Sequence, residues 1–89
     1  MHAIDVTIVN QLGMHARAAA RFVHLASSFQ AAITVQRRGR SVDGKSILGL
    51  LLLAAARGTT ITISASGPDE TEAVTALVEL IGSRFGEAS

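Results

Sequence analysis

Hydrophobic and polar residues alternate along three segments of the chain. The apolar positions that share a face are Ile4, Val6 and Ile8 in the first segment, Ile33 and Val35 in the second, and Ile61, Ile63 and Ala65 in the third. A period of two is typical of strands that bury one face and expose the other. A fourth strand, residues 40–42, is expected to pair with the second strand through a tight turn at Arg38 and Gly39.

Between these strands, apolar residues recur three or four positions apart, which is the spacing of a helix with one buried face. In the first such segment they are Ala18, Phe22, Leu25, Ala26 and Phe29. A shorter helix is predicted from about Ser46 to Leu53, with Ser46 as its N-cap. A last helix should begin near Asp69, which we expect to cap it, with Glu72 placed for a capping box. Its apolar stripe comprises Ala73, Leu77, Leu80 and Ile81.

The resulting order of elements is βαββαβα. It predicts an α+β fold, an open-faced sandwich in which a four-stranded antiparallel sheet carries three helices on one face. The 89 residues suffice for one domain, 1–89, and a hydrophobic content of 48% favours a packed core. The longest apolar stretch, residues 47–56, is far shorter than the roughly 20 residues of a membrane-spanning helix, so no membrane insertion is expected.

Charge and composition exclude several classes of function. Eight Lys and Arg against seven Asp and Glu give a net charge of +1, and Trp and Tyr are absent, so we expect no nucleic-acid binding. The absence of Cys excludes disulfides, and His2, His15 and His24 lack the spacing of metal ligands. We therefore expect a cytoplasmic protein without metal or cofactor, since the first residues also lack the pattern of a secretory signal.

The candidate chemistry lies where the first strand passes into the first helix. His15 occupies the expected N-cap position, where backbone N–H groups without intrahelical partners and the helix dipole favour an anion, by about 0.3–1 kcal/mol. Arg17 is close enough to add a guanidinium to phosphate oxygens, Ala16 leaves access open, and Gly13 allows a sharp bend. An unprotonated imidazole can attack phosphorus without a separate base. The alternative is an ordinary surface histidine at a helix start, which is the role expected of His24 on the solvent side of the same helix.

Two motifs point to a known family. Residues 13–19 (Gly-Met-His-Ala-Arg-Ala-Ala) resemble the active-site signature of HPr, the small phosphocarrier of the bacterial phosphoenolpyruvate-dependent phosphotransferase system. Residues 45–51 (Lys-Ser-Ile-Leu-Gly-Leu-Leu) resemble the second signature of that family. The resemblance implies a carrier rather than an enzyme. In it, Nδ1 of His15 accepts a phosphoryl group from enzyme I and passes it to an enzyme IIA component, with assistance from Arg17.

The same resemblance implies docking and regulation. Partners would dock on the first two helices, and the candidate contacts are Ala16, Ala20, Arg21, His24, Ile47, Leu48 and Leu51. Core packing is the alternative for the last three. Ser46 matches a serine that HPr kinase/phosphorylase modifies in many bacteria. A phosphate there would lie on a helix terminus and repel an acidic partner, although Ser46 would serve as a cap in either case. A carrier that presents one face to successive partners is expected to be a monomer.

One residue departs from the family pattern. Most members carry Pro where this chain has Ala18, and Ala there is similar to the nitrogen-regulatory branch of the family. Alanine is a good helix former, so the first helix should persist. The departure leaves open whether the acceptor belongs to sugar uptake or to nitrogen-type regulation.

The sequence also fits two other classes of protein in part. Residues 39–46 (Gly-Arg-Ser-Val-Asp-Gly-Lys-Ser) fit the P-loop pattern of nucleotide-binding domains. Alternating strands, the short chain and the carboxylate of Asp43 inside the proposed phosphate cradle count against that reading. A ligand-binding regulatory domain of ferredoxin-like topology would share the strand and helix order, but it gives no reason for His-Ala-Arg at a helix start.

Overall fold

The computed structural model describes residues 1–89, and its elements follow one another in the predicted order. They are β1 (His2–Thr7), α1 (Ala16–Ala26), β2 (Ala32–Arg37), β3 (Arg40–Asp43), α2 (Ile47–Leu52), β4 (Thr60–Ser66) and α3 (Glu70–Gly82), followed by a 3-10 turn, η1 (Arg84–Gly86). The predicted hairpin is present, because Arg37 of β2 pairs with Arg40 of β3 across the turn at Arg38 and Gly39.

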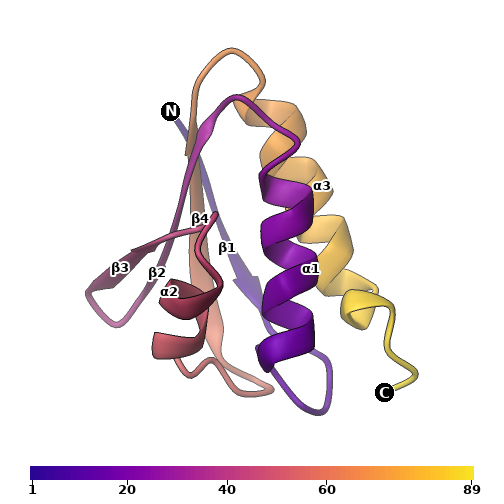
Figure 1. The fold of residues 1–89 in the computed structure, drawn as a ribbon. Helices are drawn as coiled ribbons and strands as arrows, with labels where there is room; N and C mark the ends of the chain where they lie inside the picture. Colours follow the sequence, from indigo (N-terminus) through magenta and orange to yellow (C-terminus); the bar gives the residue numbers. More distant parts are fainter.

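The four strands form one sheet in the order β1-β4-β2-β3, and every neighbouring pair is antiparallel. The helices lie on one face of this sheet and leave the other face open (Figure 1). The predicted class, an α+β open-faced sandwich, is therefore confirmed. None of the helices combines the length and the apolar character that crossing a membrane would require.

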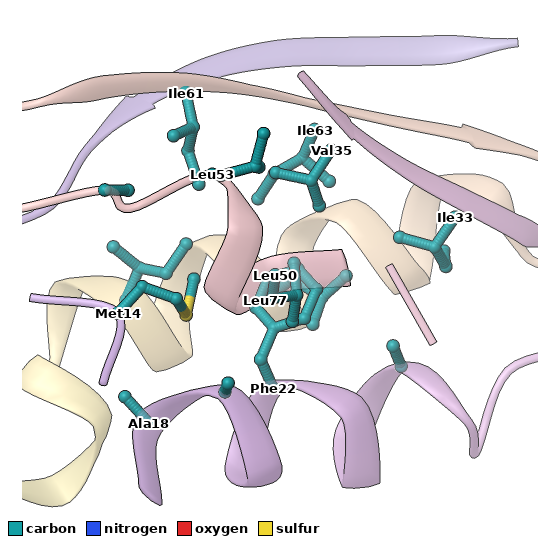
Figure 2. Close-up of a cluster of buried hydrophobic side chains, with 14 of the residues drawn as sticks. Met14, Ala18, Phe22, Ile33, Val35, Leu50, Leu53, Ile61, Ile63 and Leu77 are labelled. Carbon is teal, nitrogen blue, oxygen red and sulfur yellow. The ribbon is translucent and has the colours of Figure 1, made fainter. Parts of the chain in front are cut away.

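The core lies between the sheet and the helices. Phe22 of α1, Leu50 of α2 and Leu77 of α3 are all 0% exposed and meet the apolar side of β2 and β4 (Figure 2). The alternation predicted for β2 and β4 is confirmed, since Ile33, Val35, Ile61, Ile63 and Ala65 are buried. The helical stripes are confirmed at Ala18, Phe22, Ala26, Ala73, Leu77 and Ile81, whereas Leu25, Phe29 and Leu80 are only partly buried.

Strand β1 follows its predicted pattern less closely. It lies at one edge of the sheet, and Ile4 remains 39% exposed while Val6 is partly buried. Ile8 is fully buried, but it lies one residue beyond the end of the strand. An edge strand has a neighbour on one side only, so alternation alone overestimates its burial.

The start predicted for α3 is confirmed, since Asp69 is its N-cap residue, but the predicted side-chain capping bonds are absent. Asp69 precedes the helix but makes no side-chain cap, and its carboxylate accepts hydrogen bonds from the backbone N–H groups of Gln30 and Ala31, at 2.9 and 2.8 Å. These bonds, that of Gln30 above all, lower the pKa of Asp69. The α1–β2 and β4–α3 loops lie side by side (top of Figure 1), so the carboxylate meets donors of another segment. Glu72 is exposed and makes no capping bond, and the turn is held instead by Glu70, which accepts from the N–H of Gly67.

The P-loop reading is also wrong. Residues 40–43 of that motif form β3 and pair with β2, so they do not wrap around a phosphate. In a P-loop, Lys45 would contact a nucleotide phosphate. Here its ammonium donates a hydrogen bond to the carbonyl of Phe29 at 2.8 Å.

Candidate functional site

The loop between β1 and α1 is fixed in place before it reaches His15. Gly13 has φ +68°, and a Cβ at this position would lie 2.6 Å from the carbonyl oxygen of Ala55. The next residue, Met14, is buried and donates its N–H to that same oxygen at 2.9 Å. Only glycine fits such a close, left-handed passage, so the sharp bend expected at Gly13 is confirmed.

His15 is the N-cap of α1, as predicted. Its backbone is extended, with φ −76° and ψ 177°, and its Nδ1 accepts a hydrogen bond from the N–H of Arg17 at 3.3 Å. The first intrahelical bond runs from the N–H of Ala19 to the carbonyl of His15 at 2.8 Å. The N–H groups of Ala16 and Ala18 bond to no other protein group. The helix start therefore presents donors beside the ring, as an anion site requires.

A cavity of about 440 Å³ opens in front of the imidazole. It is lined by Leu12, His15, Ala16, Arg17, Glu87 and Ser89. Arg17 is exposed at this cavity, and the His15 side chain is 27% exposed. The structure thus brings together the two residues that the sequence singled out for phosphate chemistry, and it leaves the ring accessible.

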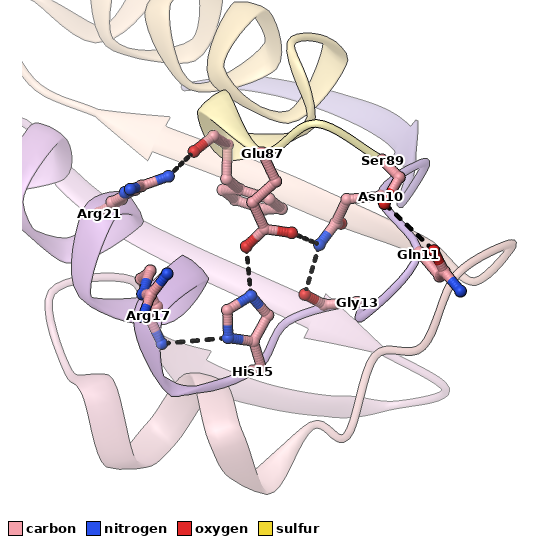
Figure 3. A network of polar contacts seen from close by, with 9 residues as sticks. Asn10, Gln11, Gly13, His15, Arg17, Arg21, Glu87 and Ser89 are labelled. Carbon is pink, nitrogen blue, oxygen red and sulfur yellow. Dashed lines mark hydrogen bonds and ion pairs between the residues drawn. The ribbon is translucent and has the colours of Figure 1, made fainter.

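Two further residues of the site were missed by the sequence reasoning. The carboxylate of Glu87 contacts His15 Nε2 with one oxygen and accepts from the side-chain amide of Asn10 at 2.9 Å with the other (Figure 3). Asn10 is fully buried and also donates to the carbonyl of Gly13 at 2.8 Å. Nothing in the pattern marked Glu87, which lies 72 positions from His15 in the sequence. In the sequence, Asn10 has no feature that distinguishes it from an ordinary loop residue.

The contacts assign one tautomer to the ring. A carboxylate only accepts hydrogen bonds, so Nε2 carries the proton. The N–H of Arg17 only donates, so Nδ1 holds the lone pair. The amide of Asn10, and after it the His15 ring, hold the pKa of Glu87 below its usual range, and the positive charge of Arg21 acts in the same direction. Glu87 is therefore a charged partner of His15 at neutral pH.

The segment that carries Glu87 has an unusual backbone. Arg84, Phe85 and Gly86 have φ of 59°, 55° and 78°, and for the two non-glycine residues this left-handed region costs about 1–2 kcal/mol each. Phe85 is 1% exposed, and its carbonyl accepts from a guanidinium N–H of Arg21. Such a conformation persists only where surrounding contacts impose it. The buried ring and the arginine supply those contacts.

The predicted docking residues lie at the surface. Ala16, Ala20, Arg21 and His24 are exposed on α1. On α2, Ile47, Leu48 and Leu51 are 42%, 68% and 36% exposed, and Leu52, which was not predicted, is 57% exposed. Core packing, the alternative for the three predicted residues, belongs instead to Leu50. These exposed side chains of α2 will be called the α2 apolar face.

Ser46 caps α2 as predicted. Its backbone is extended, and its Oγ accepts from the N–H of Gly49 at 3.0 Å. This bond accounts for the serine structurally, and any regulatory role is additional to it.

Comparison with known proteins agrees with this geometry. Residues 3–83 match the family model described as the PTS HPr component phosphorylation site. The chain belongs to the HPr family. An HPr of Cupriavidus necator is 52% identical over 83 residues, which is 93% of each chain. The crystal structure of HPr-C-His from Thermoanaerobacter tengcongensis matches with a TM-score of 0.96, at 44% identity and over 100% of both chains.

Membership settles the class of protein. HPr proteins are phosphocarriers of the phosphotransferase system and not enzymes, so the nucleotide-binding and ferredoxin-like alternatives are wrong. A relative named NPr, from Shewanella violacea, is 44% identical over 85 residues, covering 96% of this chain and 93% of its own. A structure described as an HPr dimer from Thermoanaerobacter tengcongensis matches with a TM-score of 0.79, at 45% identity and over 98% and 100% of the two chains.

Proposed function

We propose that His15 accepts a phosphoryl group from phosphorylated enzyme I and donates it to an enzyme IIA component. The observation that carries the proposal is the position of Nδ1, whose lone pair lies at the start of α1 beside the N–H of Arg17. A group bonded to Nδ1 would take the place of that lone pair in front of the helix donors. The exposed guanidinium of Arg17 borders the same cavity and supplies positive charge to phosphate oxygens.

The transfer needs no separate base. The Nδ1 lone pair attacks the phosphorus of the donor phosphohistidine, the donor P–N bond breaks, and its electron pair returns to the donor ring. Three phosphoryl oxygens then face the helix donors and Arg17. These groups are in position before the transfer, so they stabilise the negative charge of the oxygens without rearrangement. The reverse sequence of bond changes delivers the group to the acceptor.

Incubation with enzyme I and radiolabelled phosphoenolpyruvate tests this proposal. We expect acid-labile, alkali-stable label on the wild type and none on His15→Ala. His24→Ala is the matched control, because it removes an exposed histidine from the same helix. An unlabelled wild type would refute the proposal.

Docking on α1 and the α2 apolar face forms a second part of the proposal. Leu48 is the most exposed residue of that face, and burying such a side chain against a partner contributes roughly 1.5–3 kcal/mol. Leu48→Ala should therefore raise the KM for enzyme I about tenfold or more. Ile4→Ala removes an exposed aliphatic side chain from the sheet edge and should leave the KM unchanged. Equal KM values for the two variants would exclude docking through Leu48.

We propose regulation at Ser46 because this residue lies next to the α2 apolar face. A phosphate on its hydroxyl would place negative charge beside Ile47 and Leu48, where an acidic partner would be repelled. Ser46→Asp should slow transfer from enzyme I relative to Ser46→Asn, because Asn has the shape of Asp and can cap the helix but carries no charge. If Ser46→Asp accepts phosphate as fast as the wild type, the repulsion account is wrong.

The acceptor, the assembly state and the location are part of the same proposal. Relatives named HPr and NPr both match, so the phosphorylated protein should be offered to enzyme IIA components of the sugar and the nitrogen type. The type of enzyme IIA that accepts the phosphoryl group faster identifies the branch, sugar uptake or nitrogen regulation, to which the protein belongs. We propose a cytoplasmic monomer, and light scattering at working concentration tests the assembly state against the dimer that one relative forms.

A further inference from the structure

Glu87 lies outside residues 3–83, the part of the chain that matches the family model, yet it occupies one side of the His15 ring (Figure 3). Its side chain is only 14% exposed, less than that of the histidine it contacts. Its two carboxylate oxygens are divided between the imidazole and the amide of Asn10. Such an arrangement constrains the carboxylate from both sides.

We propose that Glu87 is a positioning residue that keeps a proton on Nε2 of His15 both before and after phosphorylation. It thereby presents the Nδ1 lone pair to the phosphoryl donor, and it keeps the phosphorylated ring a good leaving group. The inference rests on the proposed role of His15 and adds a residue to the transfer step.

In the free protein, Glu87 selects the reactive tautomer. A neutral imidazole carries its proton on either nitrogen, and the hydrogen bond made by one nitrogen decides the state of the other. Glu87 accepts from Nε2, and the N–H of Arg17 donates to Nδ1, so the two contacts favour the same form. Without the carboxylate, only the 3.3 Å contact from Arg17 would bias the ring.

In the phosphorylated protein, Glu87 faces a positive ring. When Nδ1 is bonded to phosphorus and Nε2 keeps its proton, the imidazole carries a positive charge that a carboxylate stabilises. On transfer to the acceptor, the P–N bond breaks, its electron pair returns to Nδ1, and a neutral imidazole leaves. If Nε2 had lost its proton, the same bond cleavage would have to expel an imidazolate anion, which is a much poorer leaving group.

The two arginines near the ring act against this protonated state. Arg17 and Arg21 are the charged residues of α1 on this side, and α2, which packs against α1, carries no titratable residue. Glu87 is the one acidic side chain that lines the cavity of His15. The left-handed turn at Phe85, anchored by Arg21, delivers it there. The C-terminal segment thus contributes the negative charge that α1 lacks.

Glu87→Gln tests the inference, because the variant keeps one oxygen that can accept from Asn10 and replaces the charged oxygen that faces His15 by a neutral amide N–H₂ group. Glu79→Gln removes an exposed carboxylate from α3 and is the matched control. Phosphoramidate can load His15 without enzyme I, and nitrogen-15 NMR then reports the protonation of Nε2 as the pH rises. We expect the midpoint to fall by about one unit or more in Glu87→Gln and to stay unchanged in Glu79→Gln. Above that midpoint, transfer to enzyme IIA should fall about tenfold per pH unit.

Further measurements separate this inference from the role of His15. Glu87→Asp keeps the charge, so the midpoint of Nε2 deprotonation should lie between those of the wild type and Glu87→Gln. If the contact were purely structural, the midpoint would not depend on the charge at position 87. The unphosphorylated ring should be an Nε2–H tautomer in the wild type and a mixture in Glu87→Gln, whether or not the protein carries phosphate. Identical tautomer populations and midpoints in the wild type and Glu87→Gln would overturn the inference. A wild type that takes no label from enzyme I would overturn the carrier role while leaving the tautomer test in place.

Discussion

Helices α1 and α2 begin in the same way and differ in what surrounds the first turn. Each has an extended N-cap residue whose side chain accepts a hydrogen bond from the helix backbone. His15 Nδ1 accepts from Arg17 at 3.3 Å, and Ser46 Oγ accepts from Gly49 at 3.0 Å. When neither residue carries a phosphate, both side chains satisfy donors that a helix start leaves free.

The surroundings separate the two sites. The His15 ring is held from its far side by Glu87, with Arg17 and Arg21 nearby. Lys45 precedes Ser46 in the chain, and its ammonium already donates a hydrogen bond to the carbonyl of Phe29. A helix start therefore supplies affinity for phosphate oxygens, but a reactive group also needs its orientation and protonation fixed by a second segment.

After the loss of His15 itself, removing Arg17 should have the largest effect on the chemistry of the first site. Loss of one donor to developing or transferred charge typically lowers a rate by about 10²–10³-fold. We expect a decrease of this order for Arg17→Ala in rapid-quench measurements of transfer from enzyme I. Arg57→Ala, which removes an exposed arginine from the loop before β4, should transfer at the wild-type rate. Similar rates for the two variants would assign Arg17 a role other than phosphate contact.

Removing Leu50 should have the largest effect on the second site. A helix of six residues is not stable alone, so α2 and its cap depend on the fully buried Leu50. Leu50→Ala should lower the free energy of unfolding by about 2–5 kcal/mol, measured by urea denaturation. Leu48→Ala, on the exposed side of the same helix, should stay within about 0.5 kcal/mol of the wild type. A small effect at Leu50 would mean that the cap, and not the core, holds α2.

Removing the cap itself should have a smaller effect. Ser46→Ala loses the hydrogen bond to Gly49 and should lower the free energy of unfolding by about 1 kcal/mol, while Ser46→Asn should restore most of it. Phosphorylation of His15 by phosphoramidate, which requires no docking, should be the same in all three proteins. A change in that reaction would show that the two helix starts are coupled.

The sequence predicted the elements because their signals are local. Alternation identified β2 and β4, helical spacing identified the stripes of α1 and α3, and the HPr signatures located His15, Arg17 and Ser46. These features depend on residues within a few positions of one another. The edge position of β1, which leaves Ile4 exposed, depends on how the whole sheet is assembled and has no local signal.

The partners that the sequence did not reveal are joined by the fold. Glu87 reaches His15 across 72 positions, and Asp69 reaches Ala31 across 38. The capping rule placed Asp69 correctly at the start of α3, but it could not anticipate free N–H groups arriving from another loop. A polar side chain can bond any donor close to it, and the tertiary fold determines which donors are close.

The third helix start gives the smallest expected effect and a characteristic pH dependence. The folded state lowers the pKa of Asp69 from its usual 3.8, chiefly through the N–H of Gln30, so the charged carboxylate contributes stability above that pH. This contribution is lost as the pH falls through the lower pKa of the folded state. Asp69→Asn should therefore melt at a lower temperature than the wild type at pH 7, and the difference should narrow below pH 3.8. Glu79→Gln, whose carboxylate makes no hydrogen bond, is the control. A difference for Asp69→Asn that is the same at pH 7 and at pH 3 would show that the shape of the side chain, and not its charge, ties the two loops together.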